Sequence, residues 1–243
     1  MSAEKTLHIF IITADWESEQ RRNHVASLQK IFPTAILQQA INPRIQKVPF
    51  LDKMIRLSAT RTGIALNPGE MGVLLSNRAI WRKVLSMEVG EEDYFLILES
   101  DSRINDRTLF QQKAVSMLQG YDLFFFGGWM GKILLHRSTR RPIAAPYFVG
   151  DANLKTICSG YGYAINKKAA AVLLRSTAKI GWPADEFKRY LPKAALRIGA
   201  VSPEIISEMP GSTTIGHPSR QSFWYDAKMQ LVYLRNHFVS YFS

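Results

Sequence analysis

Three short apolar runs, at 7–13, 94–98 and 121–126, set the fold class of this chain. Each is rich in β-branched and aromatic residues and has no polar alternation, a pattern typical of strands buried on both faces. Segments with helical spacing of apolar residues lie between the runs. This alternation of strands and helices predicts an α/β fold with a mostly parallel central sheet flanked by helices.

The helices between these strands have recognisable ends. The first contains Val25, Leu28 and Ile31 at helical spacing, and Pro33 ends it. The second begins at Asn67-Pro68-Gly69-Glu70, which has the form of a capping box, and runs to about Met87. We further predict helices at 106–119, 167–176 and from Pro183, strands at 35–40 and 161–165, and a last strand at 197–201. Residues 41–66 show no clear period and are interpreted as a long irregular insertion, and 129–153 as a loop or short hairpin.

Composition limits the class of protein. The 243 residues contain no internal repeat, so we expect a single domain over 1–243, with 217–243 as a tail that packs on the domain or on a membrane. A single cysteine, Cys158, excludes a disulfide framework and fits a reducing, cytoplasmic environment. No apolar run reaches the roughly 18 residues of a membrane-spanning helix, and the run at 7–13 is interpreted as a first strand rather than a signal peptide.

The charge points to an anionic partner. Lys and Arg number 31 against 20 Asp and Glu, a formal net charge of +11. A basic cluster at 132–141 has no interleaved aromatic residues, so nucleic acid is not expected. It fits an anionic oligosaccharide or glycolipid instead. The segment from Lys228 to Phe242 has apolar residues on one helical face, and it either lies peripherally on the inner face of the membrane or packs on the domain.

Glu99-Ser100-Asp101 follows directly after a predicted buried strand. In open α/β sheets, ligands bind beyond the carboxyl ends of strands. Residues two apart on an extended segment point the same way, so Glu99 and Asp101 are predicted to face one divalent cation together with phosphate oxygens. The alternative is a polar strand end exposed to solvent.

The order of segments resembles glycosyltransferase family 25, which includes bacterial lipooligosaccharide galactosyltransferases. The matching blocks are 11–22 (IITADWESEQRR), 69–81 (GEMGVLLSNRAIW), 96–101 (LILESD), 159–174 (SGYGYAINKKAAAVLL), 183–187 (PADEF) and 203–205 (PEI). The resemblance implies a GT-A-like nucleotide-sugar transferase fold and an inverting transfer of a hexose, galactose from UDP-galactose, to a lipooligosaccharide, a lipopolysaccharide or another cell-surface glycan. It also implies Mn²⁺ or Mg²⁺ as cofactor.

The resemblance assigns roles to particular residues. Inversion needs a carboxylate that takes the proton of the acceptor hydroxyl; Asp185 matches the family's acidic position and Glu186 is the reserve candidate. Asp185 at the start of a helix is equally well explained as a cap. The donor-binding candidates are Thr13, Arg21, Arg22, Glu70, Ser76, Asn77, Glu99, Gly160 and Tyr161, and the metal-ligand candidates are Asp101, Glu99 and His217. For Glu70 the alternative is its capping-box role, and for the arginines an exposed helix position.

Two departures from the family pattern bear on activity. Asn77 stands where the family has histidine, and Ser100 replaces the middle carboxylate of an acidic triplet. The loss of a carboxylate weakens the predicted metal site or makes the metal dispensable. The alternative function is therefore a non-catalytic or metal-independent relative of the same fold that binds a nucleotide sugar or glycan.

Overall fold

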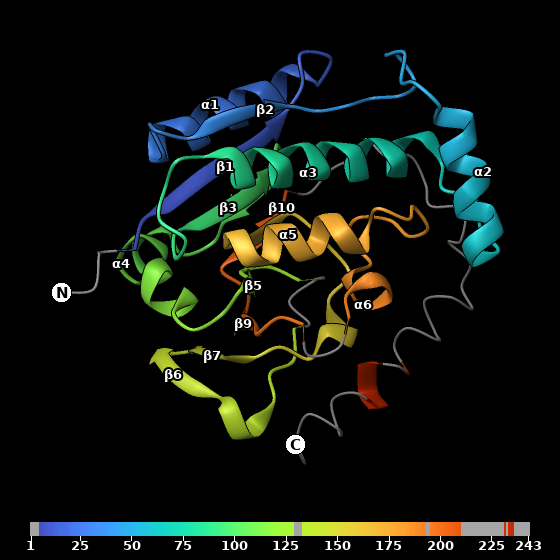
Figure 1. Ribbon diagram of the computed structural model, residues 1–243. Coiled ribbons are helices and arrows are strands. Elements are labelled where there is room, and N and C mark those ends of the chain that lie inside the picture. Colours follow the sequence, from blue (N-terminus) through green and yellow to red (C-terminus); the bar gives the residue numbers. More distant parts are fainter. Residues whose placement is uncertain (1–4, 129–132, 193–194, 210–230, 232, 236–243) are drawn as a thin grey trace.

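The computed structural model describes residues 5–128, 133–192, 195–209, 231 and 233–235. These residues form an eight-stranded sheet in the order β2-β1-β3-β8-β5-β9-β7-β6 and a two-stranded sheet of β4 and β10 (Figure 1). The strands are β1 (Leu7–Thr13), β2 (Ile36–Gln39), β3 (Tyr94–Glu99), β4 (Ser102–Ile104), β5 (Leu123–Phe125), β6 (Arg141–Ala144), β7 (Tyr147–Asp151), β8 (Gly162–Ile165), β9 (Ile198–Ser202) and β10 (Ile206–Glu208).

Most strands of the large sheet share one direction. β1 is parallel to both β2 and β3, and β5 is parallel to β9. β8 is antiparallel to β3 and β5, and β7 is antiparallel to β9 and β6. Only β8 and β7 therefore oppose the others among the described strands of this sheet. The predicted mostly parallel α/β fold is confirmed, and 129–153 contains the hairpin β6–β7.

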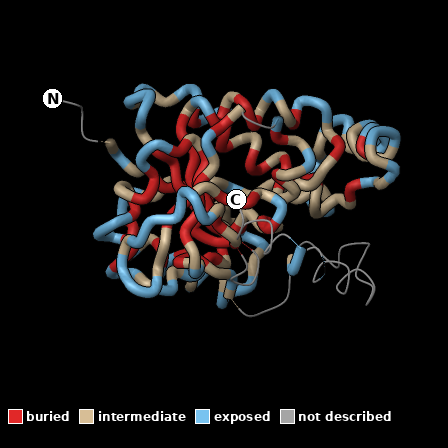
Figure 2. The backbone as a smooth tube through the Cα atoms, turned by 90° about the horizontal axis from the view of Figure 1, so that it is seen from below, coloured by how far each residue is buried: buried red, intermediate tan, exposed pale blue. Residues whose placement is uncertain are grey.

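Helices cover both faces of the sheet and bury two separate cores. On one face, α1 (Glu19–Ile31) and α4 (Arg107–Leu118) pack on Ile9, Ile11 and the other residues of that side. On the opposite face, α3 (Pro68–Ser86), α5 (Lys167–Ser176) and α6 (Phe187–Tyr190) pack on Phe10 and its neighbours. Figure 2 shows the buried residues gathered towards the centre of the backbone and the exposed residues around them. This double burial is why the strands have continuous apolar sequences.

The predicted start of α3 is confirmed. The Asn67 side chain accepts a hydrogen bond from the Glu70 backbone N–H at 2.9 Å, and Glu70 Oε2 accepts one from the Asn67 N–H at 2.8 Å. Pro68 occupies the first turn. A cap of this kind contributes about 1 kcal/mol, and it fixes the end of α3 that lies beside the candidate site.

The prediction of an irregular insertion at 41–66 is wrong, because this segment contains the helix α2 (Leu51–Thr62). Leu51, Met54 and Ile55 form a helical stripe that packs on Leu66 and the residues around it. The start of the helix has no side-chain cap, since Phe50 occupies the N-cap position. Without a capping residue, the sequence carries no start signal there.

Two smaller predictions also differ from the structure. β9 is not the last strand, because β10 follows it and pairs with β4 in antiparallel fashion. Strands of three residues are too short to show a period of two. The helix expected from Pro183 begins only at Phe187, so Asp185 precedes it by two positions.

Little of the predicted tail at 217–243 belongs to the described part of the chain. Leu231 and Leu234 are described, and their side chains are exposed. None of the described helices is long and apolar enough to cross a bilayer.

A hydrogen-bonded trio inside the core joins α3 to β8. Tyr163 Oη donates to Asn77 Oδ1 at 2.6 Å and accepts from Trp81 Nε1 at 2.9 Å. Tyr163→Phe leaves Asn77 Oδ1 and Trp81 Nε1 buried without these partners, which we expect to cost about 2–4 kcal/mol of unfolding free energy. Urea denaturation measures this cost, and Tyr147→Phe, at a partly buried tyrosine of β7, is the control expected to change stability by less than about 1 kcal/mol.

Candidate functional site

The candidate site lies where several strands end at one edge of the sheet. β1 and β3 are parallel neighbours, with Ile12 paired to Glu99, so Thr13 and Glu99 end side by side. β8 runs the opposite way, which brings its preceding residues Gly160 and Tyr161 to the same edge. This is the edge at which open α/β sheets bind ligands.

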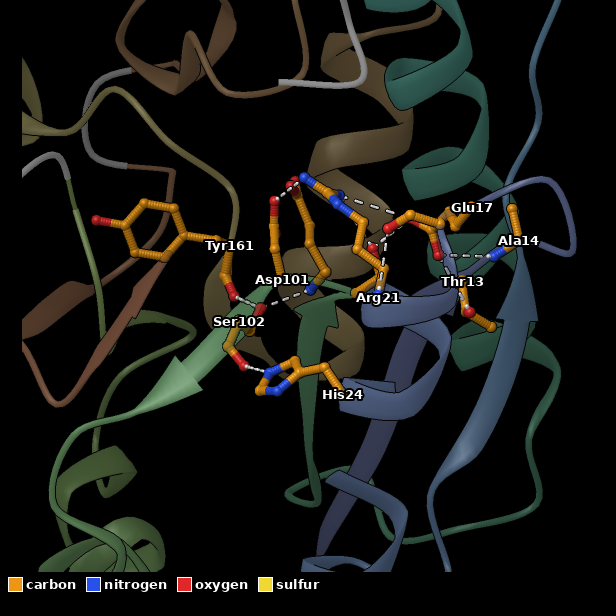
Figure 3. A network of polar contacts seen from close by, with 11 residues as sticks. Thr13, Ala14, Glu17, Arg21, His24, Asp101, Ser102 and Tyr161 are labelled. Carbon is orange, nitrogen blue, oxygen red and sulfur yellow. Dashed lines mark hydrogen bonds and ion pairs between the residues drawn. The ribbon is translucent and has the colours of Figure 1, made fainter. Parts of the chain in front are cut away.

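Arg21 of α1 ties the first helix to the turn after β3 (Figure 3). Its Nη2 lies 2.8 Å from Asp101 Oδ2, and its Nη1 donates to Ser100 Oγ at 3.2 Å. The side chains of Arg21 and Asp101 are each 17% exposed. Arg21 is thus a partly buried cation placed directly against the predicted metal ligand.

Glu17 completes this network, although sequence reasoning missed it. Glu17 Oε2 accepts from Thr13 Oγ1 at 3.4 Å and from the Ala14 backbone N–H at 3.2 Å. Its Oε1 lies 3.6 Å from Arg21 Nη1 and accepts a hydrogen bond from Ser100 Oγ. Glu17 lies just before the N-cap Ser18 of α1, so the turn that leads into the helix brings its carboxylate to Arg21 in the first turn.

The residues Glu99-Ser100-Asp101 are not extended, contrary to the prediction. β3 ends at Glu99, and Ser100 and Asp101 form the turn into β4. Ser102 holds this turn, since its Oγ accepts from the Glu99 N–H at 2.8 Å and donates to the Tyr161 carbonyl. His24 Nε2 lies 2.8 Å from the Ser102 carbonyl oxygen. Glu99 and Asp101 are therefore brought together by a turn and its hydrogen bonds.

Burial beside other carboxylates gives Glu99 an unusually high proton affinity. Burial, together with the nearby Asp101 and Asp185, raises the pKa of Glu99 to about 8, while Arg21 opposes the rise. A Cβ atom at position 160 would lie 3.4 Å from Glu99 Oε1, so Gly160 leaves this carboxyl room. Asp101 Oδ1 is buried and has no hydrogen-bond partner among the described residues.

Asp185 lies close enough to this cluster for its charge to act on Glu99. Burial, with smaller contributions from Glu186 and Glu70, raises the pKa of Asp185 to about 6. The N-cap of α6 is Glu186 and it makes no side-chain capping bond, so Asp185 does not cap this helix. Glu186 Oε2 lies 3.5 Å from Lys188 Nζ. Of the two candidates, Asp185 is the one whose charge acts on Glu99.

Several predicted donor-binding residues lie elsewhere or have other partners. Ser76 Oγ accepts from the Ile41 N–H at 2.8 Å and donates to the Gly72 carbonyl, so it holds the chain after β2 against α3. Asn77 belongs to the core trio described above. Arg22 is exposed and donates to the carbonyl oxygens of Asp15 and Glu17.

Tyr161 has a structural partner, and His217 falls outside the described part of the chain. Tyr161 Oη donates to Glu204 Oε2 at 2.7 Å, and Gly128 N–H donates to the same oxygen at 2.6 Å, so the phenol is used in fixing the loop after β5. His217, the third predicted metal ligand, lies outside the described residues.

The described residues hold no group of three or more His, Cys, Asp or Glu side chains arranged to bind a metal. Magnesium-type sites often use only one or two carboxylates and take their other ligands from phosphates and water. Glu99 and the unpaired Asp101 Oδ1 fit that more limited role. Arg21 holds the other Asp101 oxygen, so a cation bound there would share one carboxylate with the guanidinium.

Comparisons with known proteins leave the family open. The sequence matches no family model and no curated protein. Among solved structures, mannose-1-phosphate geranyltransferase from Thermus thermophilus is similar over 83% of this chain and 76% of that one, with 13% identity and a TM-score of 0.39. The two folds overlap too loosely for this similarity to bear on function. The resemblance to glycosyltransferase family 25 stays a prediction.

The raised pKa of Glu99 predicts a specific pH dependence of stability. Between its ordinary value of 4.5 and about 8, the folded state keeps a proton that the unfolded chain loses, so wild-type stability falls as pH rises. Glutamine at position 99 carries no charge at any pH, so the Glu99→Gln variant does not lose stability in this way as pH rises. Its advantage over wild type should grow by at least ~1.4 kcal/mol from pH 4.5 to 8, measured by denaturation in chelator.

Asp101, Asp185, Glu208 and Arg21 all act on Glu99 and are present in both proteins. Glu88→Gln, at an exposed glutamate of the segment before β3, is the control and should follow the wild-type profile. A constant difference between Glu99→Gln and wild type across this pH range would contradict the assignment.

Proposed function

We propose that this chain is an inverting glycosyltransferase that transfers a hexose, galactose from UDP-galactose, to a lipooligosaccharide, lipopolysaccharide or related cell-surface glycan. The observation that carries the proposal is the convergence of Glu99, Asp101 and Asp185 with Arg21 at the carboxyl edge of an α/β sheet. The ordered sequence blocks that resemble glycosyltransferase family 25 add the reaction class and the GT-A-like fold.

Donor binding depends on cations at an edge that is otherwise acidic. The carboxylates of Glu99 and Asp101 repel an approaching diphosphate unless a positive charge lies between the carboxylates and the phosphates. Arg21 offers planar donors suited to phosphate and lies beside Asp101. A Mn²⁺ or Mg²⁺ ion on Glu99 and Asp101 would neutralise charge that develops on the diphosphate leaving group.

Asp185 acts as the general base in this proposal. Its carboxylate removes the proton of the acceptor hydroxyl while the hydroxyl oxygen attacks the sugar carbon and the bond to the diphosphate breaks. A pKa of about 6 suits a base that works near neutral pH, because it is ionised yet retains proton affinity. Glu186 remains the reserve base, although its neighbours Lys188 and Arg189 hold it as an ion pair.

One contact favours the second candidate function, a metal-independent nucleotide-sugar-binding relative of the same fold. Arg21 occupies Asp101 Oδ2 and hydrogen-bonds to Ser100, the residue that replaces a carboxylate of the family pattern. A guanidinium at this point supplies positive charge that a metal would otherwise bring. Donor binding in the presence of chelator, without any transfer, would support this candidate.

The acceptor in this proposal is an anionic glycolipid or oligosaccharide at the inner face of the cytoplasmic membrane. Within the predicted basic cluster, Arg141 begins β6 and the Arg140 guanidinium stacks on the ring of Phe148 at 3.6 Å. Lys132 of the same cluster is not among the described residues. Phosphorylated saccharides fit such basic side chains by charge.

The first test of donor binding is thermal stabilisation by UDP, UDP-galactose, UDP-glucose and UDP-N-acetylglucosamine, each with Mn²⁺ and with chelator. A donor at 100 times its dissociation constant adds about 2.7 kcal/mol. We expect UDP-galactose to stabilise in chelator and more strongly with Mn²⁺. Arg21→Met should weaken binding at least about tenfold, because a charge-assisted contact is lost, whereas the exposed Arg103→Met should bind like wild type. An absence of any donor effect would contradict the proposal.

Transfer activity tests the base. Asp185→Asn removes the proton acceptor and should lower kcat by about 10²–10⁴-fold, with donor affinity unchanged. Because the pKa of Asp185 is about 6, kcat/KM of the wild type should rise with pH through about 6. Glu186→Gln is the matched variant and should keep most of the activity; the reverse ranking would assign the base to Glu186.

A further inference from the structure

A mixed apolar and basic surface lies on and beside α2, at the side of the molecule opposite α4 (Figure 1). We define this α2 surface by Ile45, Lys47, Phe50, Lys53 and Arg56. Phe50 is 78% and Ile45 61% exposed. Lys47, Phe50, Lys53 and Arg56 line one shallow hollow of about 560 Å³, together with a single acidic residue, Asp52. Large apolar side chains and positive charge are thus presented together.

Phe50 breaks three local preferences at once. It takes the N-cap position of α2 without any side-chain capping bond, where Asn, Asp or Ser would stabilise the helix. Its φ of 59° lies in the left-handed region, which costs energy for a bulky residue. Its ring also buries little surface on folding. Rules broken together at one residue indicate a role outside the folding of the chain itself.

The opposite side of α2 is firmly attached to the domain. Leu51, Met54 and Ile55 pack on the cluster around Leu66, and Arg61 Nη1 donates to the Ile180 carbonyl at 3.1 Å. The same cluster contains Ala184, the neighbour of Asp185. The α2 surface is therefore a fixed part of the molecule, connected through packed side chains to the candidate site.

We infer that the α2 surface docks onto the interface of an anionic lipid bilayer. Aromatic and aliphatic side chains gain by entering the boundary between headgroups and acyl chains, while lysine and arginine pair with anionic headgroups. Each basic residue near such a surface contributes about as much as a fivefold change in affinity. A nucleic acid backbone would neutralise the same cations but would leave Phe50 and Ile45 in water. Docking here does not require the proposed transferase activity.

Co-sedimentation of the full chain with vesicles tests the inference, with no donor or acceptor present. Vesicles of phosphatidylcholine with phosphatidylglycerol should bind the protein, and vesicles of phosphatidylcholine alone should not. Phe50→Asn should weaken binding about tenfold while the Tm stays equal or rises, because asparagine tolerates left-handed backbone and caps helices. Lys53→Glu with Arg56→Glu should weaken binding at least about 30-fold.

A control variant with the same change in net charge separates local docking from overall attraction. Arg107→Glu with Lys113→Glu alters two exposed residues of α4, at the far side of the molecule, and should bind vesicles within about twofold of wild type. Equal losses in both double variants would overturn the inference. So would equal binding to neutral vesicles, or a dimer in solution that Phe50→Asn dissociates, since the surface would then serve a second copy of this chain.

Discussion

A sheet that is buried on both faces leaves only its edges for chemistry. Helices α1 and α4 cover one side of the central strands and α3 and α5 cover the other, so the strand interiors are mostly apolar. The polar side chains of the candidate site therefore gather where β1 and β3 end and where β8 begins. This constraint explains why residues from four distant parts of the sequence meet at a single edge.

At the candidate site, the negative charges of the carboxyl groups are only partly balanced by the positive charge of Arg21. Asp101 and Asp185 both raise the proton affinity of Glu99, and Arg21 is the basic side chain that opposes this effect. Partly buried carboxylates without full compensation cost folding free energy. Such a cost is commonly retained where a ligand or cation supplies the missing charge. The excess of negative charge thus lowers the stability of the protein without ligand, and it is also the basis of the proposed donor site.

The α2 segment carries the proposed membrane-docking surface, on a part of the molecule separate from the strand ends. Its inner face shares a small core with α3 and with Ala184, next to Asp185, whereas its outer face presents Phe50 among basic residues. If a bilayer holds the outer face, a lipid-linked acceptor would reach the protein on the side where the proposed base lies.

The sequence by itself determined the elements that depend on local chemistry. The apolar runs predicted β1, β3 and β5, the Asn67–Glu70 capping box predicted the start of α3, and the strand end at Glu99 located the edge. These signals arise from periodicity and from hydrogen bonds between near neighbours. Tertiary structure alone decided that Arg21 pairs with Asp101, that Asn77 is used in the core by Tyr163, and that 51–62 is helical. The first two outcomes depend on contacts across about 80 residues, which leave no local pattern in the chain. In 51–62 the spacing of Leu51, Met54 and Ile55 is local, but no capping residue marks the start of the helix, and packing on Leu66 and its neighbours holds it in place.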